Sequence, residues 1–330
     1  MEKSKSVFSF FKGKNKEQVT PYIIIMTLIA VVLVFTVINN LFFSGNFFSG
    51  QNFHSILLTS VTVGIIAIGE CVAITAGYFD MSVGMVAAMG GLTAATVMKN
   101  TGSVFLSVMS GIVLGLICGL MAGLCVSVLH MNAFITTYAM QSVYRGIIYI
   151  FTDGFPISMH HPEFNNYTKW GQMKLFGFLQ FPIFVLIVLY ILVALFMRYR
   201  KLGRSIYLVG GNARCAEICG IKLHVIQIFC FLLCDTLAAI AGMLYASRIG
   251  AANAFLGETI VMESIASTIV GGTVMGGGKS NLALTFIGVL IVYSVKNGLI
   301  MCGLPDFYQY IAIGIILFVA VCLQIERTKN

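Results

Sequence analysis

Six ionisable side chains stand inside long apolar stretches of this sequence, where charge is costly. They are Glu70, Asp80, Arg145, Asp235, Glu263 and Lys296. An ionised group at the centre of a bilayer costs about 2.5–3.5 kcal/mol on insertion scales, so each of them must face a protein interior or a watery space. Such groups can line a polar pathway. The other interpretation is internal pairing, such as Arg145 with a carboxylate, which joins helices without touching a substrate.

The sequence carries no recognisable set of catalytic residues. The glycine-rich run 271–280 ends in Gly-Lys-Ser like a phosphate-binding loop, but that pattern requires glycine at position 273, which is threonine. Two cysteine pairs have a spacing that places two thiolates on one helix face: Cys215 with Cys219, and Cys230 with Cys234. No histidine pattern completes a metal site beside them. We therefore expect neither enzyme activity nor a bound metal in this chain.

One polar segment has the features of a short helix with its own caps. Asn212 is a good N-cap, and Gly220 suits the left-handed position that follows a helix. About seven residues fit between them, and a helix of two turns is unstable without a partner surface. That surface belongs either to this protein or to another subunit.

Long apolar segments must position all of these residues. Of the 330 residues, 58% are hydrophobic and 10% are charged, against roughly 45–50% and about 25% in soluble domains. A hydrocarbon core of about 30 Å takes about 20 helical residues to cross, and a helix pairs its own backbone groups. The sequence therefore predicts an all-α, polytopic membrane protein with about ten transmembrane helices. Their expected bounds are 21–41, 55–77, 83–98, 104–129, 133–153, 180–197, 225–247, 259–275, 282–301 and 307–325.

The basic residues set the orientation of these helices, because lysine and arginine are enriched in cytoplasmic segments. With the N-terminus inside, only Lys99, Lys169 and Lys174 fall in outside segments. The inside segments hold Lys3, Lys5, Lys12, Lys14, Lys16, Arg198, Arg200, Lys201, Arg204, Arg214, Lys222, Lys279, Arg327 and Lys329. An even number of crossings returns the C-terminus to the cytoplasm, so we expect both termini there.

The polar connections divide the chain into parts. We expect a cytoplasmic N-terminal tail, 1–20, a single transmembrane domain, 21–325, and a cytoplasmic tail, 326–330. Within the domain, an extracytoplasmic loop spans 154–179 and a cytoplasmic loop spans 198–224. The short capped helix lies in the cytoplasmic loop.

Glycine recurs at every fourth position in one of the apolar segments. The four residues are Gly111, Gly115, Gly119 and Gly123. This spacing puts them on one helix face, where a second helix can approach closely. Packing within the chain is favoured over a subunit interface, and either role is structural.

Four stretches match, in order and spacing, segments that occur together in one family. Ile74 to Gly84 is similar to LTGGIDLSVG, and Asn132 to Pro156 is similar to PPFIVTLGTMSIFRG. Arg204 to Gly220 is similar to GRxxYAIGGNxxAAxLSGI, and Glu263 to Lys279 is similar to DAIAAVVIGGTSLSGGRG. Over residues 50–325 the chain thus resembles the permease subunits of bacterial ATP-binding-cassette (ABC) sugar importers, the ribose, galactose and xylose permease family.

The resemblance implies a permease subunit of a binding-protein-dependent importer in the bacterial inner membrane. In that family two permeases form a homodimer or a heterodimer embedded in lipid, two ATPase subunits bind on the cytoplasmic side, and an extracytoplasmic binding protein delivers the sugar. No nucleic acid is involved. This chain would hold no cofactor, because ATP and Mg are bound by the partner ATPase.

The resemblance also implies a function for the capped helix. Family permeases insert a cytoplasmic helix into a groove of the ATPase, so that motion of the ATPase reaches the membrane helices. The expected ATPase-coupling residues are Arg204, Gly210, Gly211, Asn212, Arg214, Glu217 and Gly220. A neutral sugar needs hydrogen-bonding groups along its path. The residues expected in this translocation pathway are Asp80, Asn132, Gln141 and Glu263.

Two other classes of protein are alternatives to a permease subunit of an ABC importer. An ion-coupled secondary transporter of a small polar solute would use Glu70, Asp80 or Asp235 as a proton or sodium site. A membrane-embedded enzyme would need clustered catalytic side chains near one interface, and the sequence offers none. Among cargoes, pentoses, hexoses, nucleosides and small signalling furanoses all fit the resemblance.

Overall fold

The computed structural model describes residues 16–42, 46–159, 164–175 and 177–329, and most of them are helical. In chain order the helices are α2 (Lys16–Phe42), α3 (Gly50–Thr75), α4 (Val83–Thr101), α5 (Val104–Ser127), α6 (Ala133–Thr152), α7 (Asn165–Gln172), α8 (Phe181–Tyr199), α9 (Lys201–Gly211), α10 (Ala213–Ile218), α11 (Leu223–Ile249), α12 (Gly257–Val270), α13 (Leu282–Met301) and α14 (Phe307–Lys329). Two antiparallel ribbons pair β1 (Ile157–Ser158) with β4 (Ala251–Ala252), and β2 (Lys174–Leu175) with β3 (Leu179–Gln180). Most of the expected tail 1–20 lies outside the described residues.

Each of the ten predicted apolar segments overlaps one observed helix, and the predicted segment 282–301 has the bounds of α13. Several helices begin where a serine or asparagine oxygen accepts a backbone N–H of the first turn. These N-caps are Ser49, Ser103, Asn132 and Asn281. Among the described residues, six helices are by themselves long and apolar enough to cross a membrane: α2, α3, α5, α8, α11 and α13. The chain is therefore an all-α, multi-pass membrane protein.

The predicted helix 259–275 is shorter than expected. α12 ends at Val270, and its 14 residues have a length of about 21 Å, less than a hydrocarbon core of about 30 Å. Gly272 follows with a φ of +87°, a left-handed conformation that glycine adopts without steric cost. The prediction that the helix reaches residue 275 was wrong because this glycine turn ends it.

The loop 198–224 contains a helix that the sequence did not suggest. Only α10 was expected between residues 198 and 224, yet α9 precedes it. The buried residues of α9 are Gly203, Ile206 and Val209, which recur at every third position and form one face. A Cβ at Gly203 would lie 2.6 Å from the Cα of Met197. α9 therefore depends on tight packing against the end of α8.

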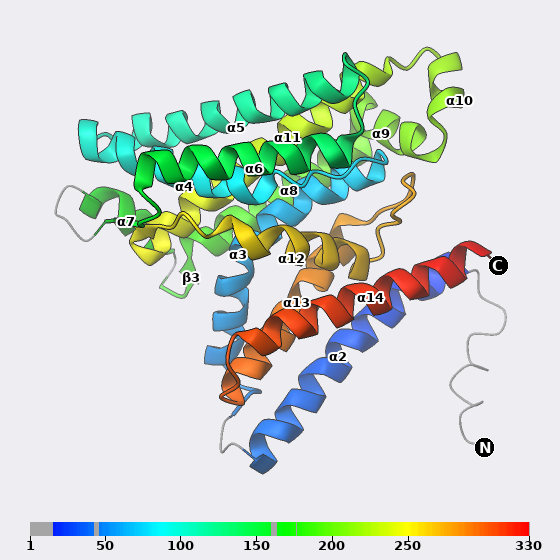
Figure 1. The fold of residues 1–330 in the computed structure, drawn as a ribbon. Helices are drawn as coiled ribbons and strands as arrows, with labels where there is room; N and C mark the ends of the chain where they lie inside the picture. Colours follow the sequence, from blue (N-terminus) through cyan, green and yellow to red (C-terminus); the bar gives the residue numbers. More distant parts are fainter. Residues whose placement is uncertain (1–15, 43–45, 160–163, 176, 330) are drawn as a thin grey trace, which may run out of the picture.

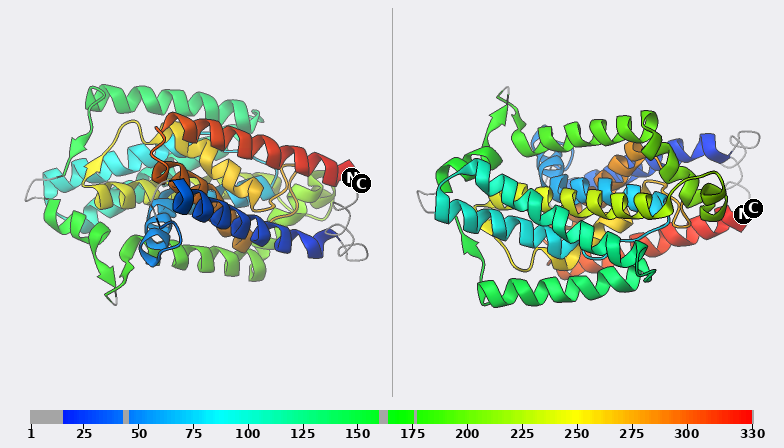
Figure 2. Two further views of the ribbon diagram at one scale, coloured as in Figure 1. Left: turned by 90° about the horizontal axis from the view of Figure 1, so that it is seen from below. Right: turned by 90° about the horizontal axis from the view of Figure 1, so that it is seen from above.

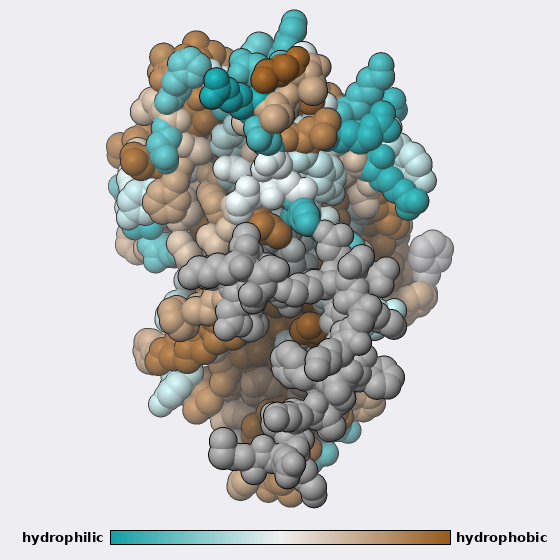
Figure 3. Space-filling view, turned by 90° about the vertical axis from the view of Figure 1, so that its right-hand side faces the viewer, coloured by the Kyte–Doolittle hydropathy of each residue, from teal (hydrophilic) through white to brown (hydrophobic). Residues whose placement is uncertain are grey.

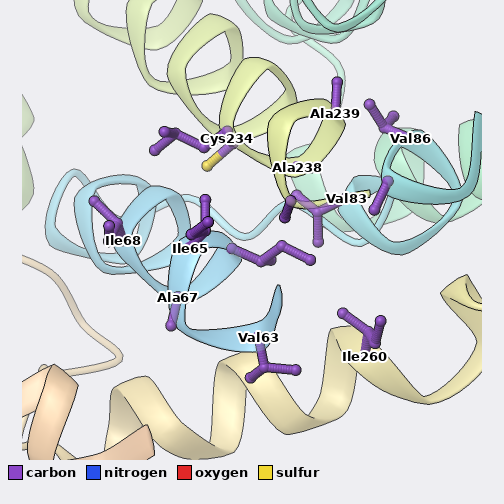
Figure 4. Packing of buried hydrophobic residues seen from close by; sticks show 14 of the residues in the cluster. Val63, Ile65, Ala67, Ile68, Val83, Val86, Cys234, Ala238, Ala239 and Ile260 are labelled. Atoms are coloured by element: carbon purple, nitrogen blue, oxygen red, sulfur yellow. The ribbon is translucent and has the colours of Figure 1, made fainter. Parts of the chain in front are cut away.

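α11 is the central helix of the fold, and α3, α4 and α5 pack around it (Figure 1). Figure 4 shows small and branched side chains of α3, α4, α11 and α12 meeting there: Val63, Ile65, Ala67, Ile68, Val83, Val86, Cys234, Ala238, Ala239 and Ile260. A Cβ at Gly90 of α4 would lie 2.7 Å from the Cα of Ala239. The backbones of α4 and α11 thus touch, which fixes the residues between them.

The helices run between two ends of the molecule. α9 and α10 lie at one end, together with the start of α2 and the last turn of α14, whereas α7 lies at the opposite end (Figure 1). α6 and α8 lie on opposite flanks of the bundle (Figure 2). The described parts of loops 154–179 and 198–224 therefore lie at opposite ends of the bundle.

α7 is attached to α11 at the end opposite α10. The Tyr167 hydroxyl donates to the Met243 carbonyl at 2.9 Å, and the Ser247 hydroxyl donates to the Tyr167 carbonyl at 2.6 Å. Burial raises the pKa of Tyr167, so its hydroxyl remains a donor. The part of loop 154–179 that the structure describes is therefore held against the bundle.

Candidate functional site

α10 is a six-residue helix with a cap at each end. The Asn212 Oδ1 accepts the Cys215 N–H at 3.0 Å. Gly220 has a φ of +83° and donates its N–H to the Glu217 carbonyl at 2.9 Å, and the Ile221 N–H reaches the Ala216 carbonyl at 3.0 Å. Both caps are those predicted from the sequence, and they define a helix that is too short to be stable alone.

α10 presents nearly all of its surface to the outside, because only Ala216 is buried. The predicted coupling residues Arg214 and Glu217 are exposed. Ile218 is 80% exposed, and Leu208 of α9 and Val225 of α11 are also exposed. Figure 3 views this end of the molecule and shows hydrophobic residues among hydrophilic ones. Ile218 was missed as a site residue, although an isoleucine in an otherwise small and polar helix was visible in the sequence.

The two glycines before α10 differ in their surroundings. A Cβ at Gly210 would overlap the carbonyl oxygen of Thr75, whereas a Cβ at Gly211 would meet nothing within 4 Å. Arg204, one further predicted coupling residue, is exposed on α9. Nearby, burial raises the pKa of Tyr207, against the opposing effect of the Ser280 hydroxyl that donates to it at 3.4 Å. Gly210 is therefore a packing residue, and Gly211 and Arg204 are surface residues.

Three carboxyl groups meet inside the bundle, and we call Glu70, Asp80 and Asp235 the carboxyl cluster. All three are completely buried. The Asp80 Oδ1 accepts the Ser82 N–H at 2.9 Å and its hydroxyl at 2.6 Å, and that hydroxyl lies 3.4 Å from the Asp235 Oδ1. Glu70 lies close enough to interact electrostatically with both aspartates. Within the described residues, no ion pair reaches this cluster.

Glu263 has an internal partner. Its Oε1 lies 2.7 Å from the Lys296 Nζ, and its Oε2 accepts the Tyr293 hydroxyl at 2.9 Å. These contacts join α12 to α13. Of the two interpretations open for Glu263, pathway and pairing, the geometry is that of pairing. Arg145 also faces a carboxylate, Glu258, at 3.9 Å, but both side chains are more than 40% exposed, so water weakens that attraction.

The remaining pathway candidates lie apart from Glu263. Asn132 caps α6 through the Ile135 N–H at 3.2 Å and borders a cavity of about 370 Å³ near Tyr78 and Gln227. Gln141 is buried, and its Oε1 has no hydrogen-bond partner. In the part of the chain that the structure describes, no hydrogen bond or ion pair joins any two of the four predicted pathway side chains.

The glycine face of α5 packs against α11. The positions are Gly111, Gly115, Gly119 and Gly123, and all four are buried. A Cβ at Gly115 would lie 2.7 Å from the Asp235 carbonyl oxygen, and one at Gly119 would lie 2.6 Å from the Phe231 carbonyl oxygen. This is the intramolecular contact that the sequence favoured.

Comparison with known proteins gives a consistent result over nearly the whole chain. A family model described as the branched-chain amino acid transport system / permease component matches residues 52–321. The chain is 29% identical to the ribose import permease protein RbsC of Escherichia coli (strain K12) over 302 residues, 91% of this chain and 93% of that protein. It is 33% identical to the probable ABC transporter permease protein YphD of that strain over 324 residues, 97% of this chain and 96% of that protein.

A third relative from the same strain is the L-arabinose transport system permease protein AraH. The chain is 30% identical to it over 325 residues, 98% of this chain and 95% of that protein. No solved structure matches the chain.

Proposed function

The chain belongs to this family of transport-system permease components, and we propose that it is the membrane subunit through which an ABC importer carries a sugar into the cell. The names of two relatives support a sugar as cargo, because they are ribose and L-arabinose permeases. A separate ATPase would bind ATP and Mg and drive the transport, and an extracytoplasmic binding protein would deliver the sugar. A second permease copy or a related subunit would complete the complex.

The proposal of an ATPase partner rests on the structure of α10. It is a capped helix of six residues with an exposed Ile218 beside the exposed charges of Arg214 and Glu217, in the loop 198–224, whose basic residues predict a cytoplasmic location. A helix this short gains little from its own hydrogen bonds, and its aliphatic side chain gains stability only when a partner covers it. Docking into a groove of the ATPase meets both needs and makes α10 the coupling helix.

We further propose ten membrane-embedded helices with both termini in the cytoplasm, in the bacterial inner membrane. The basic residues support this orientation. α12 is too short to cross alone, so residues 271–281 complete the passage without helical hydrogen bonds. Non-helical backbone at membrane depth is tolerated where protein buries it. In this segment the Val274 N–H donates to the Lys279 carbonyl at 3.0 Å and the Gly278 N–H donates to the Thr75 carbonyl at 2.8 Å.

Reconstitution tests the proposal. The chain is placed in proteoliposomes with an ABC ATPase subunit and an extracytoplasmic sugar-binding protein, and uptake of radiolabelled ribose is measured with L-arabinose in parallel. ATP-dependent uptake that persists when ionophores dissipate the ion gradients is expected. Uptake that stops with the ionophores while ATP is held constant would refute the proposal and favour an ion-coupled transporter.

Variants of the coupling helix provide a second test. Glu217→Arg and Gly211→Leu should abolish uptake and co-purification of the ATPase without affecting membrane insertion. A side chain at Gly211 has open space within this chain, so its effect reports on the partner. Lys169→Glu, on the exposed surface of α7 at the opposite end, is the matched control and should retain the ATPase. Normal uptake by Glu217→Arg would contradict the coupling assignment.

A further inference from the structure

Three chain segments meet directly behind the coupling helix. They are the last turn of α3, the last turn of α9 and the glycine-rich segment 274–280. The Gly278 N–H donates to the Thr75 carbonyl at 2.8 Å. The Thr75 hydroxyl lies 2.6 Å from the Ser280 hydroxyl and donates to it. The ends of α3 and of this segment are therefore joined by both backbone and side-chain hydrogen bonds.

Gly210 of α9 is tightly packed in this contact. A Cβ there would overlap the Thr75 carbonyl oxygen and would lie 2.5 Å from the Gly278 nitrogen. A Cβ at Gly277 would lie 2.8 Å from the Gly210 carbonyl oxygen. Gly277 and Gly278 have φ values of +82° and +77°, which glycine adopts readily. The three backbones thus touch with no side chain between them.

α9, which ends at Gly211, is connected to α10 by a single residue, Asn212. The Asn212 N–H donates to the Leu208 carbonyl at 3.0 Å, and the Asn212 carbonyl accepts the Ala216 N–H at 3.0 Å. The last turn of α9 therefore runs into α10 without a flexible link. On the other side, α3 leads to Asp80 within five residues, and the glycine-rich segment leads to Asn281, the N-cap of α13.

We propose that Thr75, Gly210 and Gly278 form a joint that transmits displacement of α10 to α3 and α13. The inference rests on the proposed function, in which an ATPase moves α10. Packed backbones cannot compress, so a displacement of the end of α9 is passed directly to the other two segments. Coupling between distant sites travels through such contiguous packed contacts. These three are positioning residues, because they act through the segments that they join.

Two variants and a matched control test the joint in the complete transporter with its ATPase and binding protein. Gly210→Ala inserts a methyl group between the three backbones. Thr75→Val keeps the volume of the side chain and removes its hydrogen bonds to the Ser280 hydroxyl and the Cys71 carbonyl. Gly276→Ala is the control, because a Cβ there meets nothing within 4 Å although the residue lies in the same segment. The measured quantity is the number of ATP molecules hydrolysed per ribose imported.

That ratio should rise about tenfold in Gly210→Ala and about threefold in Thr75→Val, since mutations along a coupling network change coupling by such factors. It should stay at the wild-type value in Gly276→Ala. A purely structural role would lower hydrolysis and import together and leave the ratio unchanged. If Gly210→Ala does not accumulate in membranes, the ratio measured for Thr75→Val alone tests the joint.

An unchanged ratio in Thr75→Val would overturn the joint, as would a change in Gly276→Ala equal to that in Gly210→Ala. A wild-type complex that hydrolyses ATP but imports neither ribose nor L-arabinose would instead contradict the proposed function. The proposal of the joint depends on that function and would then be refuted as well.

Discussion

Replacing Glu263 by glutamine should destabilise the protein by leaving Lys296 without its counter-charge. The Lys296 Nζ and the Glu263 Oε1 are 2.7 Å apart, and the side chains are 19% and 3% exposed. The same carboxylate accepts the Tyr293 hydroxyl at 2.9 Å. The substitution keeps the size of the side chain and removes only its charge. Its effect therefore measures the electrostatic part of the contact between α12 and α13.

The expected magnitude follows from the burial of both groups. Removing one partner of a buried ion pair costs about 3–5 kcal/mol, because the other charge stays buried without compensation. The unfolding entropy of a chain of 330 residues is about 0.7 kcal/mol/K, at about 2.1 cal/mol/K per residue. The melting temperature should therefore fall by about 4–7 °C. Adding Lys296→Met removes the second charge as well, and at least half of the loss should then be recovered.

A thiol-reactive dye provides the assay. Cys71, Cys230 and Cys234 are buried and free, so they react only as the detergent-solubilised protein unfolds. Melting curves of the wild type, the two single variants and the double variant form a double-mutant cycle. A double variant that melts at the temperature expected from adding the two single effects would refute the reasoning, because the pair would then contribute no mutual stabilisation.

Three further predictions concern other parts of the fold. Asn212→Ala should weaken co-purification of the ATPase about fivefold, because α10 loses a cap contributing about 1 kcal/mol; unchanged co-purification would contradict this. Gly119→Leu should prevent accumulation of folded protein, measured by size-exclusion chromatography of a fluorescent fusion, whereas Gly146→Leu, where an added Cβ meets nothing within 4 Å, should accumulate normally. Asp235→Asn should leave the melting temperature unchanged or raise it, because the amide carries no charge that burial beside Glu70 and Asp80 would penalise; a fall of more than about 3 °C would argue against this.

The helices and their caps were predictable because they depend on residues close in the chain. Each apolar run of membrane length overlaps an observed helix, and Asn212 and Gly220 predicted the bounds of α10. The glycine face of α5 was also visible, because a spacing of four residues defines one side of a helix whatever packs there. The end of α12 was placed incorrectly because the apolar composition continues past the turn at Gly272.

The sequence by itself determined that this protein is a helical membrane permease and which short helix stands apart from the membrane spans. Only the tertiary structure decided which polar residues are partners. Glu263 pairs with Lys296, 33 residues away, and Asp80 shares Ser82 with Asp235, 153 residues from that serine. Only the structure separated the tightly packed Gly210 from the open Gly211. The physical reason is that local pattern fixes where a helix begins and which of its faces is apolar, whereas contacts between helices depend on how all of them pack together.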